Sequence, residues 1–513
     1  MGDECSLVNK NWLPHLTNEM MIGARNNNLC SYLIALEGWR RGLKLTWYSD
    51  KVKKRGVHAP GRLFSLGNND REHIFYKSKG DKVTKEAVRI GSDKALTKKW
   101  LLKAGISVPN GSLLTKEDMY EDIISYSRQL TYPLVLKPTT GNQGNGVIAN
   151  IENEGALRDA ISYLRTERGF ENLILERHIS GQEYRFFVIE NNVIAVLNRI
   201  PANVIGDGVH TISQLIDLKN KKRKRNPRLY SCLIKKDYEI KRLIDKGIFT
   251  LDSIPKKGEQ IFLSEKSNIS TGGDSVDVTD EMPNEIKQIA INALKAVPGL
   301  PHGGLDMIVN LKEKTATVLE INPIPQIGSL VFPMEGKARD IPSALIDYYF
   351  PETINKEGYN GGIYFDFKST LQPLINKSAK EVVVTPAPLT ELYAKKYIVK
   401  GKVQGVNYRR WIRKRALESD LFGFTKNEAN GDVTVVVAGS KEAVNNFKFT
   451  CKNGPSKAEV ISVTESTWQR PIKACFEIKE QSMQKKKMST SNQQRKQKIN
   501  FIKKIMRKIN QHL

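Results

Sequence analysis

Two acidic residues and an amide lie on two consecutive predicted strands and could hold a divalent cation. Asp306 lies in the first of these apolar stretches, and Glu320 and Asn322 lie at the end of the second. Because side chains alternate between the faces of a strand, Glu320 and Asn322 would share one face. Carboxylate and amide oxygens suit Mg²⁺, whose remaining positions ATP phosphates can fill. The alternative to a metal site is that these polar residues only solvate the end of a strand. That explanation fits poorly, because they follow a hydrophobic strand that ends at Pro323.

A lysine and a glycine-rich segment upstream could bind the phosphates themselves. Lys137 ends a predicted buried strand, where its ammonium group needs an anion, and Gly141, Gly144 and Gly146 follow it. Glycines let backbone amides approach phosphate oxygens closely. A glycine loop alone would favour a surface hairpin. Together with the downstream carboxylates, it predicts a site for ATP and magnesium.

A second group of residues, near the C-terminus, could bind a phosphate without a metal. A predicted strand leads into the loop Gln404–Tyr408, and a basic helix begins with Arg409. Free amides and the positive end of a helix then converge on one point, where an arginine can bind a phosphate through two hydrogen bonds. From composition alone, a basic surface helix is the alternative.

Length and composition limit the elements that can position these groups. The chain has 513 residues, 40 % of them apolar, which predicts three to five domains with sizeable cores. No stretch approaches the roughly 20 apolar residues of a membrane-spanning helix, and no secretory signal is visible. Five scattered cysteines indicate free thiols in a reducing compartment. We therefore expect a cytoplasmic protein.

The formal net charge of +26 is concentrated in two places. Residues 481–513 hold ten Lys or Arg residues and no acid, and a second cluster spans Lys219–Arg225. The remaining chain is only mildly basic, which favours small anionic ligands over dedicated nucleic-acid binding. We expect the cluster to be solvated surface. The tail, with apolar residues at helical spacing, either docks on the protein or contacts an anionic membrane or RNA surface.

Changes in composition divide the chain into an α/β domain, a larger α/β domain, a partly structured linker, a compact α+β domain and a basic tail. Helices are predicted over Leu29–Arg41, from the capping residues Ser92 and Asp93 to Lys103, and over Ile341–Tyr349. The predicted boundaries are 1–91, 92–350, 351–392, 393–479 and 480–513.

The middle of the chain resembles the ATP-grasp carboxylate–amine ligases. The likeness is carried by Lys137-Pro138 with its glycine loop, by residues 176–185, by Arg199-Ile200-Pro201 and by Glu320-Ile321-Asn322-Pro323. It covers residues 92–350 and is greatest with the ATP-grasp domain of cyanophycin synthetase and of bifunctional glutathione synthetases. The resemblance implies an ATP-grasp fold.

The resemblance also implies a role for each matching residue. Lys94 and Lys137 would contact ATP phosphates, and residues 141–147 would cover them. The hinge from Glu176 through His178 to Ile179 would hold adenine, and Glu183 would bind the ribose hydroxyls. Arg199 would face the phosphates, and Asp306, Glu320 and Asn322 would bind two Mg²⁺ ions, which Mn²⁺ could replace.

One position departs from a more distant branch of the family. D-alanine ligases carry an arginine two positions before the metal-binding aspartate, where this chain has Gly304. The group that stabilises the transition state of acyl transfer must then come from elsewhere. Arg199 and Arg185 are the candidates.

Residues 393–479 resemble the acylphosphatases over the whole of that small domain. In this family an arginine in the phosphate-binding loop is followed eighteen residues later by an asparagine that orients the attacking water. Arg409 and Asn427 have this spacing. The resemblance implies a ferredoxin-like fold, in which positioning and electrostatics suffice to hydrolyse a carboxyl phosphate.

The sequence as a whole predicts an ATP- and magnesium-dependent ligase fused to an acylphosphatase. ATP would phosphorylate a carboxylate of an amino acid or peptide, and an amine would displace the phosphate. An acylphosphatase regulated by a nucleotide-binding ATP-grasp domain is the alternative. The residues at the metal and phosphate positions argue against a relict domain in a peptide- or RNA-binding protein. The oligomeric state stays open, homo-oligomers included.

Overall fold

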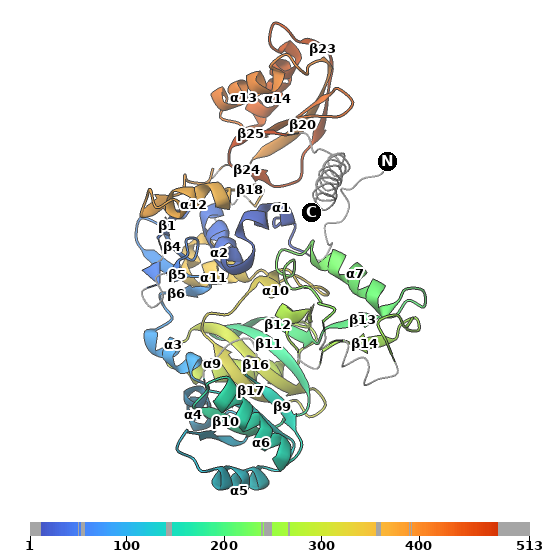
Figure 1. Cartoon of the computed structure of the whole chain (residues 1–513). Helices are drawn as coiled ribbons and strands as arrows, with labels where there is room; N and C mark the ends of the chain where they lie inside the picture. Colours follow the sequence, from blue (N-terminus) through green and yellow to red (C-terminus); the bar gives the residue numbers. More distant parts are fainter. Residues whose placement is uncertain are drawn as a thin grey trace, which may run out of the picture. The chain divides into compact units, whose positions relative to one another are not determined.

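The computed structural model describes residues 12–49, 51–52, 57–139, 146–237, 240, 249–264, 267–354, 361–388, 390 and 392–480. The chain divides into two compact units, Met1–Thr390 (the first unit) and Glu391–Leu513 (the second unit), which Figure 1 shows in sequence colours. None of the described helices is long and apolar enough to cross a membrane.

An antiparallel sheet of order β19-β1-β4-β5-β6 forms the N-terminal part of the first unit together with α2. Helix α2 (Leu29–Arg40) agrees with its predicted range and is buried along its whole length, because its sequence is apolar on nearly every side. The strands are β1 (Lys44–Tyr48), β4 (Leu63–Gly67), β5 (Glu72–Tyr76), β6 (Lys79–Gly80) and β19 (Glu381–Val383). Short elements here are α1 (Asn18–Met21), η1 (Ile22–Ala24), η2 (Asn26–Asn28), β2 (Lys51–Val52) and β3 (Val57–His58).

The segment 351–392, predicted to be a linker, joins this N-terminal part. Strand β19 pairs with β1, and the Tyr32 hydroxyl in α2 donates a hydrogen bond to the Phe365 carbonyl at 2.9 Å. Glycine and proline obscured these contacts in the sequence, because strand pairing depends on residues more than 300 positions away. The segment contains η5 (Pro351–Thr353), β18 (Ile363–Tyr364) and α12 (Phe367–Ile375).

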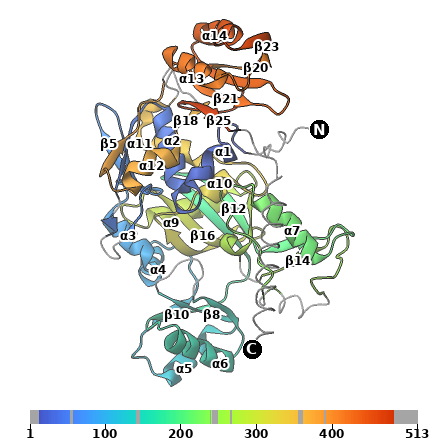
Figure 2. The ribbon, with the colours of Figure 1, turned by 45° about the horizontal axis from the view of Figure 1, so that its top comes forward.

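A smaller antiparallel sheet of order β7-β10-β8-β9 follows in the chain. Leucines of β8 (Leu134–Pro138) and β10 (Leu173–Arg177) face α5 (Tyr120–Leu130) and α6 (Glu154–Ser162) in one apolar cluster. Both helices lie on the same side of this sheet in Figure 2. Alternation along the strands therefore turns Lys137 and Glu176 to the opposite face. The remaining elements are β7 (Gly111–Leu114), β9 (Ile148–Ile151) and η3 (Tyr163–Glu167).

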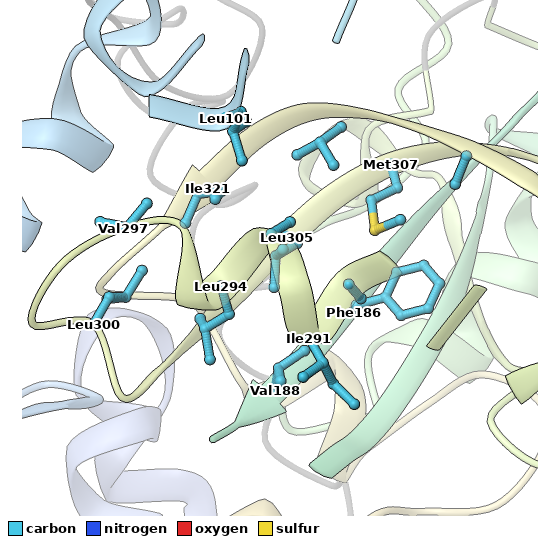
Figure 3. Close-up of a cluster of buried hydrophobic side chains, with 14 of the residues drawn as sticks. Leu101, Phe186, Val188, Ile291, Leu294, Val297, Leu300, Leu305, Met307 and Ile321 are labelled. Atoms are coloured by element: carbon cyan, nitrogen blue, oxygen red, sulfur yellow. The ribbon is translucent and has the colours of Figure 1, made fainter. Parts of the chain in front are cut away.

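A larger antiparallel sheet of order β15-β12-β11-β16-β17 carries the main core of the first unit. Figure 3 shows Ile291 and Leu294 of α9 packed towards Phe186 and Leu305 of the sheet. Burying each such side chain contributes about 1.5–3 kcal/mol. The strands are β11 (Gln182–Ile189), β12 (Asn192–Ile200), β15 (Asp274–Asp277), β16 (His302–Asn310) and β17 (Thr315–Asn322). The helices around it are α3 (Lys85–Ser92), α4 (Lys94–Lys103), α9 (Asn284–Lys295), α10 (Gly328–Val331) and α11 (Ile341–Tyr349).

Between β12 and β15 the chain forms a small subdomain with its own apolar cluster. Strands β13 (Asn203–Ile205) and β14 (Gln260–Phe262) pair beside α7 (Ile212–Arg223), which begins with a capping box at Thr211. The turn η4 (Ile269–Thr271) follows.

The second unit is a sheet of order β23-β20-β22-β21-β25 with two helices packed on one face. The order strand, helix, strand, strand, helix, strand matches the ferredoxin-like fold that the sequence predicts. The strands are β20 (Tyr393–Lys402), β21 (Phe422–Asn427), β22 (Val433–Gly439), β23 (Glu459–Thr467), β24 (Ile472–Lys473) and β25 (Phe476–Lys479). The helices are α13 (Tyr408–Glu418) and α14 (Lys441–Asn453).

Candidate functional site

The face of the large sheet opposite its core gathers the charged residues that the sequence singles out. In β16 the core takes Leu305 and Met307, so Asp306 lies on the other face. In β11 the core takes Tyr184 and Phe186, so Arg185 shares the face of Asp306. The β-register makes Asp306 the direct neighbour of Arg185 on one side and of Glu320 on the other.

A bulge in β17 sets the direction of the predicted metal ligands. The pairing shifts between Asp306–Glu320 and Met307–Val318, so Leu319 has no partner of its own. Val318 and Ile321 both point into the core as a result, and Glu320 lies on the same face as Asn322. The predicted shared face of Glu320 and Asn322 therefore agrees with the burial pattern, and bulges of this kind often redirect side chains at functional sites.

Two arginines neutralise Asp306. Arg185 donates to both carboxylate oxygens, with Nη2 at 2.7 Å from Oδ2, and Arg199 lies 3.1 Å from each oxygen. Burial alone would raise the pKa of Asp306, but the two arginines hold this pKa below its ordinary value. The structure thus brings both candidate arginines to the candidate metal-binding aspartate.

Glu183 lies next to this group. Arg199 Nη1 donates to Glu183 Oε1 at 2.7 Å, so one guanidinium joins two carboxylates. Burial, together with nearby Asp306, raises the pKa of Glu183 against the pull of Arg199. A bound ribose would have to share Glu183 with Arg199.

Gly304 marks the place where the side chain of Arg185 lies. A Cβ built on Gly304 would lie 3.3 Å from Arg185 Nη1 and 3.4 Å from its Cδ. The guanidinium of Arg185 therefore lies beside the position whose arginine the D-alanine ligases use. The contact crosses from one strand to the next, so the sequence alone could name Arg185 as a candidate but could not choose it.

The donor chemistry of Asp306, Glu320 and Asn322 fits a magnesium ion. They provide two carboxylates and one amide oxygen from adjacent strands. Asn322 Oδ1 accepts a hydrogen bond from the Ile324 amide at 2.9 Å, which orients the amide group. Among the described residues, no three Asp, Glu, His or Cys side chains form a metal-binding group, so the amide and bound phosphates would have to complete the ligand set.

Three lysines lie around a buried glutamate on the face of the small sheet that is turned away from α5 and α6. Lys137 Nζ lies 2.5 Å from Glu176 Oε2, and Lys98 Nζ lies 3.5 Å from Glu176 Oε1. Lys94 and Lys98, one helical turn apart on α4, line a narrow pocket with Lys137 and Glu176. The pocket also has apolar walls from Leu101, Val108, Pro109, Val318 and Leu319.

Burial lowers the pKa of Lys94 and of Lys98. Glu320 opposes this shift at Lys94, whereas the nearby charge of Lys137 adds to it. Burial makes the charged form of each lysine less favourable, and a bound phosphate would offset this effect. Sequence reasoning missed Lys98, although its spacing of four residues from Lys94 on a predicted helix was a usable signal.

Of the other predicted ATP contacts, His178 and Ile179 lie between β10 and β11, and the glycines lie between β8 and β9. The His178 amide donates to the Pro133 carbonyl at 2.9 Å, and Ile179 is partly buried. Gly146 has a φ of +76°, which favours glycine. Gly141 and Gly144 lie outside the described residues.

A further polar group, which the sequence did not single out, lies where α2 begins. Arg228 Nη1 donates to Cys232 Sγ at 2.8 Å, and the Arg25 guanidinium covers the Tyr230 ring at 4.5 Å. Three buried atoms have no hydrogen-bond partner among the described residues: Arg25 Nε, Arg228 Nε and Gln326 Oε1. Within the described part of the chain, no carboxylate pairs with either arginine.

The cluster Lys219–Arg225 is not wholly solvated surface as predicted. Arg223 is completely buried, and it and Lys219 pair with Asp274 at 3.0 and 2.5 Å. Their spacing of four residues puts both on the inner face of α7. The other basic residues of the cluster, Lys221, Lys222, Lys224 and Arg225, are exposed.

In the second unit, the residues of the predicted anion site lie in the loop between β20 and α13. Gly405 and Asn407 have φ values of +77° and +63°, and Asn407 precedes α13 without making a side-chain capping bond. Amides at this helix end can therefore serve an anion. The described contact of the Arg409 guanidinium is a weak one, to the Lys479 carbonyl at 3.4 Å.

Asn427 lies at the end of β21, on the same face of the sheet as the core. Its Oδ1 atom is buried and has no hydrogen-bond partner among the described residues. Gln404, which sequence reasoning also missed, donates from Nε2 to the carbonyls of Glu428 and Asp432, both at 2.9 Å. Gln404 thereby ties the anion loop to the turn that follows Asn427, and the oxygen without a described partner is suited to accept a hydrogen bond from water.

Comparisons with known proteins match both units. Residues 91–207 match the RimK-like ATP-grasp domain, and residues 395–478 match the acylphosphatase family. The chain is 33 % identical over 324 residues to the glutathione biosynthesis bifunctional protein GshAB of Pasteurella multocida, which covers 59 % of this chain and 42 % of that protein. It is 32 % identical over 312 residues to the cyanophycin synthetase of Trichormus variabilis, covering 59 % of this chain and 34 % of that protein.

One solved structure similar to this chain is that of a bifunctional glutathione synthetase from Pasteurella multocida. It has 30 % identity and a TM-score of 0.45, over 57 % of this chain and 40 % of the other. An acylphosphatase from Bacillus subtilis has 32 % identity and a TM-score of 0.16, over 17 % of this chain and 98 % of the other. The chain spans less than half the length of the two sequence relatives named above.

Proposed function

We propose that this chain, which joins a RimK-like ATP-grasp domain to an acylphosphatase domain, is an ATP- and magnesium-dependent carboxylate–amine ligase with a second, hydrolytic site. The main observation behind the proposal is that Arg185, Arg199 and Asp306 converge on the face of the large sheet opposite its core. The same unit also has a lysine-lined pocket, which would bind the phosphates of ATP.

The lysine pocket would bind ATP. Lys94 and Lys137 would pair with phosphate oxygens, and Gly141, Gly144 and Gly146 would cover them. Glu176, His178 and Ile179 would hold the adenine beside the apolar walls of the pocket, and Glu183 would take the ribose hydroxyls. The burial that lowers the pKa of Lys94 supports this assignment, because an anion would offset the cost that burial imposes on the charged lysine.

Asp306, Glu320 and Asn322 would hold magnesium, which supplies positive charge at the transferring phosphoryl group. Arg185 would release Asp306 and turn its guanidinium to the charge that develops on the reacting groups. Its place beside Gly304 supports this role. The substrate carboxylate would be phosphorylated, and an amine would then attack the carbonyl carbon and expel phosphate.

The polar group at the start of α2 would bind the substrate. Arg25 Nε and Arg228 Nε, which have no partner among the described residues, would serve as donors to a carboxylate, and Gln326 Oε1, likewise without a described partner, would accept from an ammonium group. This combination suits an amino acid or the end of a peptide. The assignment gives the N-terminal part of the first unit a role in substrate binding.

In the second unit, Arg409 would bind the phosphate of a carboxyl phosphate through two hydrogen bonds, and Asn427 would orient the attacking water. No acid is needed for departure, because a carboxylate with a pKa of about 4 leaves readily.

The second candidate function is an acylphosphatase that the ATP-grasp domain regulates. It is favoured by the contrast between the unsatisfied Asn427 Oδ1 and an Asp306 already neutralised by two arginines.

Product analysis tests the choice between these functions. The full chain is incubated with ATP, Mg²⁺ and pooled proteinogenic amino acids, and the products are weighed by mass spectrometry. The ligase predicts a condensation product that disappears in Glu320→Gln. Hydrolysis of benzoyl phosphate without any carboxylate-dependent ADP formation would favour the second function.

A further inference from the structure

We propose that the second unit hydrolyses acyl phosphates that leave the first unit unused, so that the chain edits its own ligation at the expense of ATP. This inference rests on the proposed ligase function. Its physical basis is that the product of the first step in one unit belongs to the chemical class that the other unit can hydrolyse.

The two reactions balance as a sequence. In the first unit a substrate carboxylate attacks the γ-phosphorus of ATP, the bond to ADP breaks, and an acyl phosphate forms. In the second unit water attacks the phosphorus of that acyl phosphate. The phosphorus–oxygen bond to the acyl group breaks, the carboxylate leaves with the electron pair, and the proton of the water passes to solvent. The net reaction is hydrolysis of ATP to ADP and phosphate.

The residues of the anion site in the second unit would contact the phosphate rather than the acyl group of an acyl phosphate. Cβ atoms built on Gly405 and Gly431 would meet no atom of the described residues within 4 Å, so that part of the chain leaves the space beside both turns open. Arg409 and Asn427 provide the recognition, and both act on phosphate and water. We therefore infer that the site accepts acyl phosphates with little regard to the acyl group, as editing of unintended substrates requires.

The charge on α13 favours capture of such compounds. Arg413 is exposed one helical turn after Arg409 on α13, so a second cation lies near the phosphate site. A field of this kind raises the rate at which anions arrive. Placement on one chain also keeps the hydrolytic site at a fixed ratio to the site that produces its substrate, and tethering raises its effective concentration.

Hydroxylamine provides a probe for escaped acyl phosphates, because it converts them to stable hydroxamates. The full chain is incubated with ATP, Mg²⁺, pooled proteinogenic amino acids and hydroxylamine, and hydroxamate formed per ADP is measured. The variants are Arg409→Ala and Asn427→Ala, each shown by circular dichroism to be folded and by benzoyl phosphate to lack hydrolysis. The matched control is Arg410→Ala, which removes an exposed arginine next to the site.

We expect hydroxamate per ADP to rise about 3- to 10-fold in both hydrolysis-deficient variants and to stay near the wild-type value in Arg410→Ala. An unchanged ratio in both variants, with carboxylate-dependent ADP formation intact, would overturn the editing inference and leave the ligase function standing. Absence of carboxylate-dependent ADP formation in the wild type would overturn both.

Discussion

The two candidate sites differ in how far their charges are already paired. In the first unit, Asp306 is held by two arginines and Glu176 by two lysines. In the second unit, the described contact of the Arg409 guanidinium is a long one to a carbonyl, and the Asn427 side-chain oxygen has no described partner. One site is closed on itself through ion pairs, and the other is open to a ligand.

This difference follows from the charge that each site must hold. A site for ATP and magnesium collects groups of both signs, and without the ligand these groups neutralise one another. A site for one phosphate needs only donors and a positive field, and no carboxylate of the described residues pairs with Arg409. We therefore expect the first site to exchange ion pairs on binding and the second to bind with little rearrangement.

The largest effect is expected at the open site. Arg409→Ala should reduce kcat/KM for benzoyl phosphate about 10³-fold, because the phosphate loses a charged partner that can donate two hydrogen bonds. Arg410→Ala, adjacent and exposed, should change it less than threefold. A loss below tenfold in a folded Arg409→Ala variant would show that the loop amides alone bind the phosphate.

Removing the shared carboxylate of the first site should lower the stability of the first unit. Asp306→Ala leaves Arg185 and Arg199 buried without their shared carboxylate and should lower the free energy of unfolding of the first unit by about 3 kcal/mol. Asn427→Ala removes an oxygen without a described partner and should change that of the second unit by no more than about 1 kcal/mol. Calorimetry of the full chain measures both transitions. Equal losses in the two variants would contradict the contrast between the sites.

Catalysis should separate the sites as well. Glu320→Gln should lower carboxylate-dependent ATP turnover about 10²-fold or more, because an amide binds magnesium more weakly than a carboxylate. Removing divalent cations with EDTA should have the same effect. Hydrolysis of benzoyl phosphate should stay unchanged in both cases. If both activities fall together in a folded variant, the two-site assignment is wrong.

Local patterns predicted much of this arrangement. The predicted helices over Leu29–Arg41 and from Ser92 to Lys103 agree with α2 and α4 to within two residues, and Asp93 caps α4 as expected. Alternation in β17 correctly placed Glu320 and Asn322 on one face. These features depend on neighbours in the chain.

Contacts between distant residues were beyond sequence reasoning. The approach of Arg185 to Gly304 depends on the register of β11 against β16, and the burial of Arg223 depends on Asp274, 51 residues away. A basic cluster has the same composition whether its members face water or a buried carboxylate. The charged residues were therefore visible in the sequence, but their partners were not.

The substrate group at the start of α2 gives a smaller effect. Arg228→Met should raise the KM for the amino-acid pool about 10-fold and leave the KM for ATP within twofold, because it removes one charged hydrogen-bond donor from the substrate alone. Lys222→Met, which removes an exposed cation of α7, is the control. Equal increases in both KM values would place Arg228 outside the substrate site.

The last prediction concerns stability and the lysine pocket without its ligand. Burial lowers the pKa of Lys94 below that of the unfolded chain, so the folded state binds fewer protons in the window between the two values. The charged form therefore costs stability below this window, and the cost declines as the pH rises towards about 10.5. Lys94→Met should raise the unfolding temperature of the nucleotide-free first unit at pH 7.5, and the gain should shrink at pH 9.5.

Lys99→Met, an exposed lysine on the same helix, should produce no such pH-dependent gain. Because Lys94 would pair with phosphate, Lys94→Met should also raise the KM for ATP about 10- to 100-fold. The variant would then be more stable without nucleotide and less able to bind it, as expected where burial opposes a charge that nucleotide binding uses. A lower unfolding temperature at both pH values would show instead that the ion pairs of the closed site already satisfy Lys94.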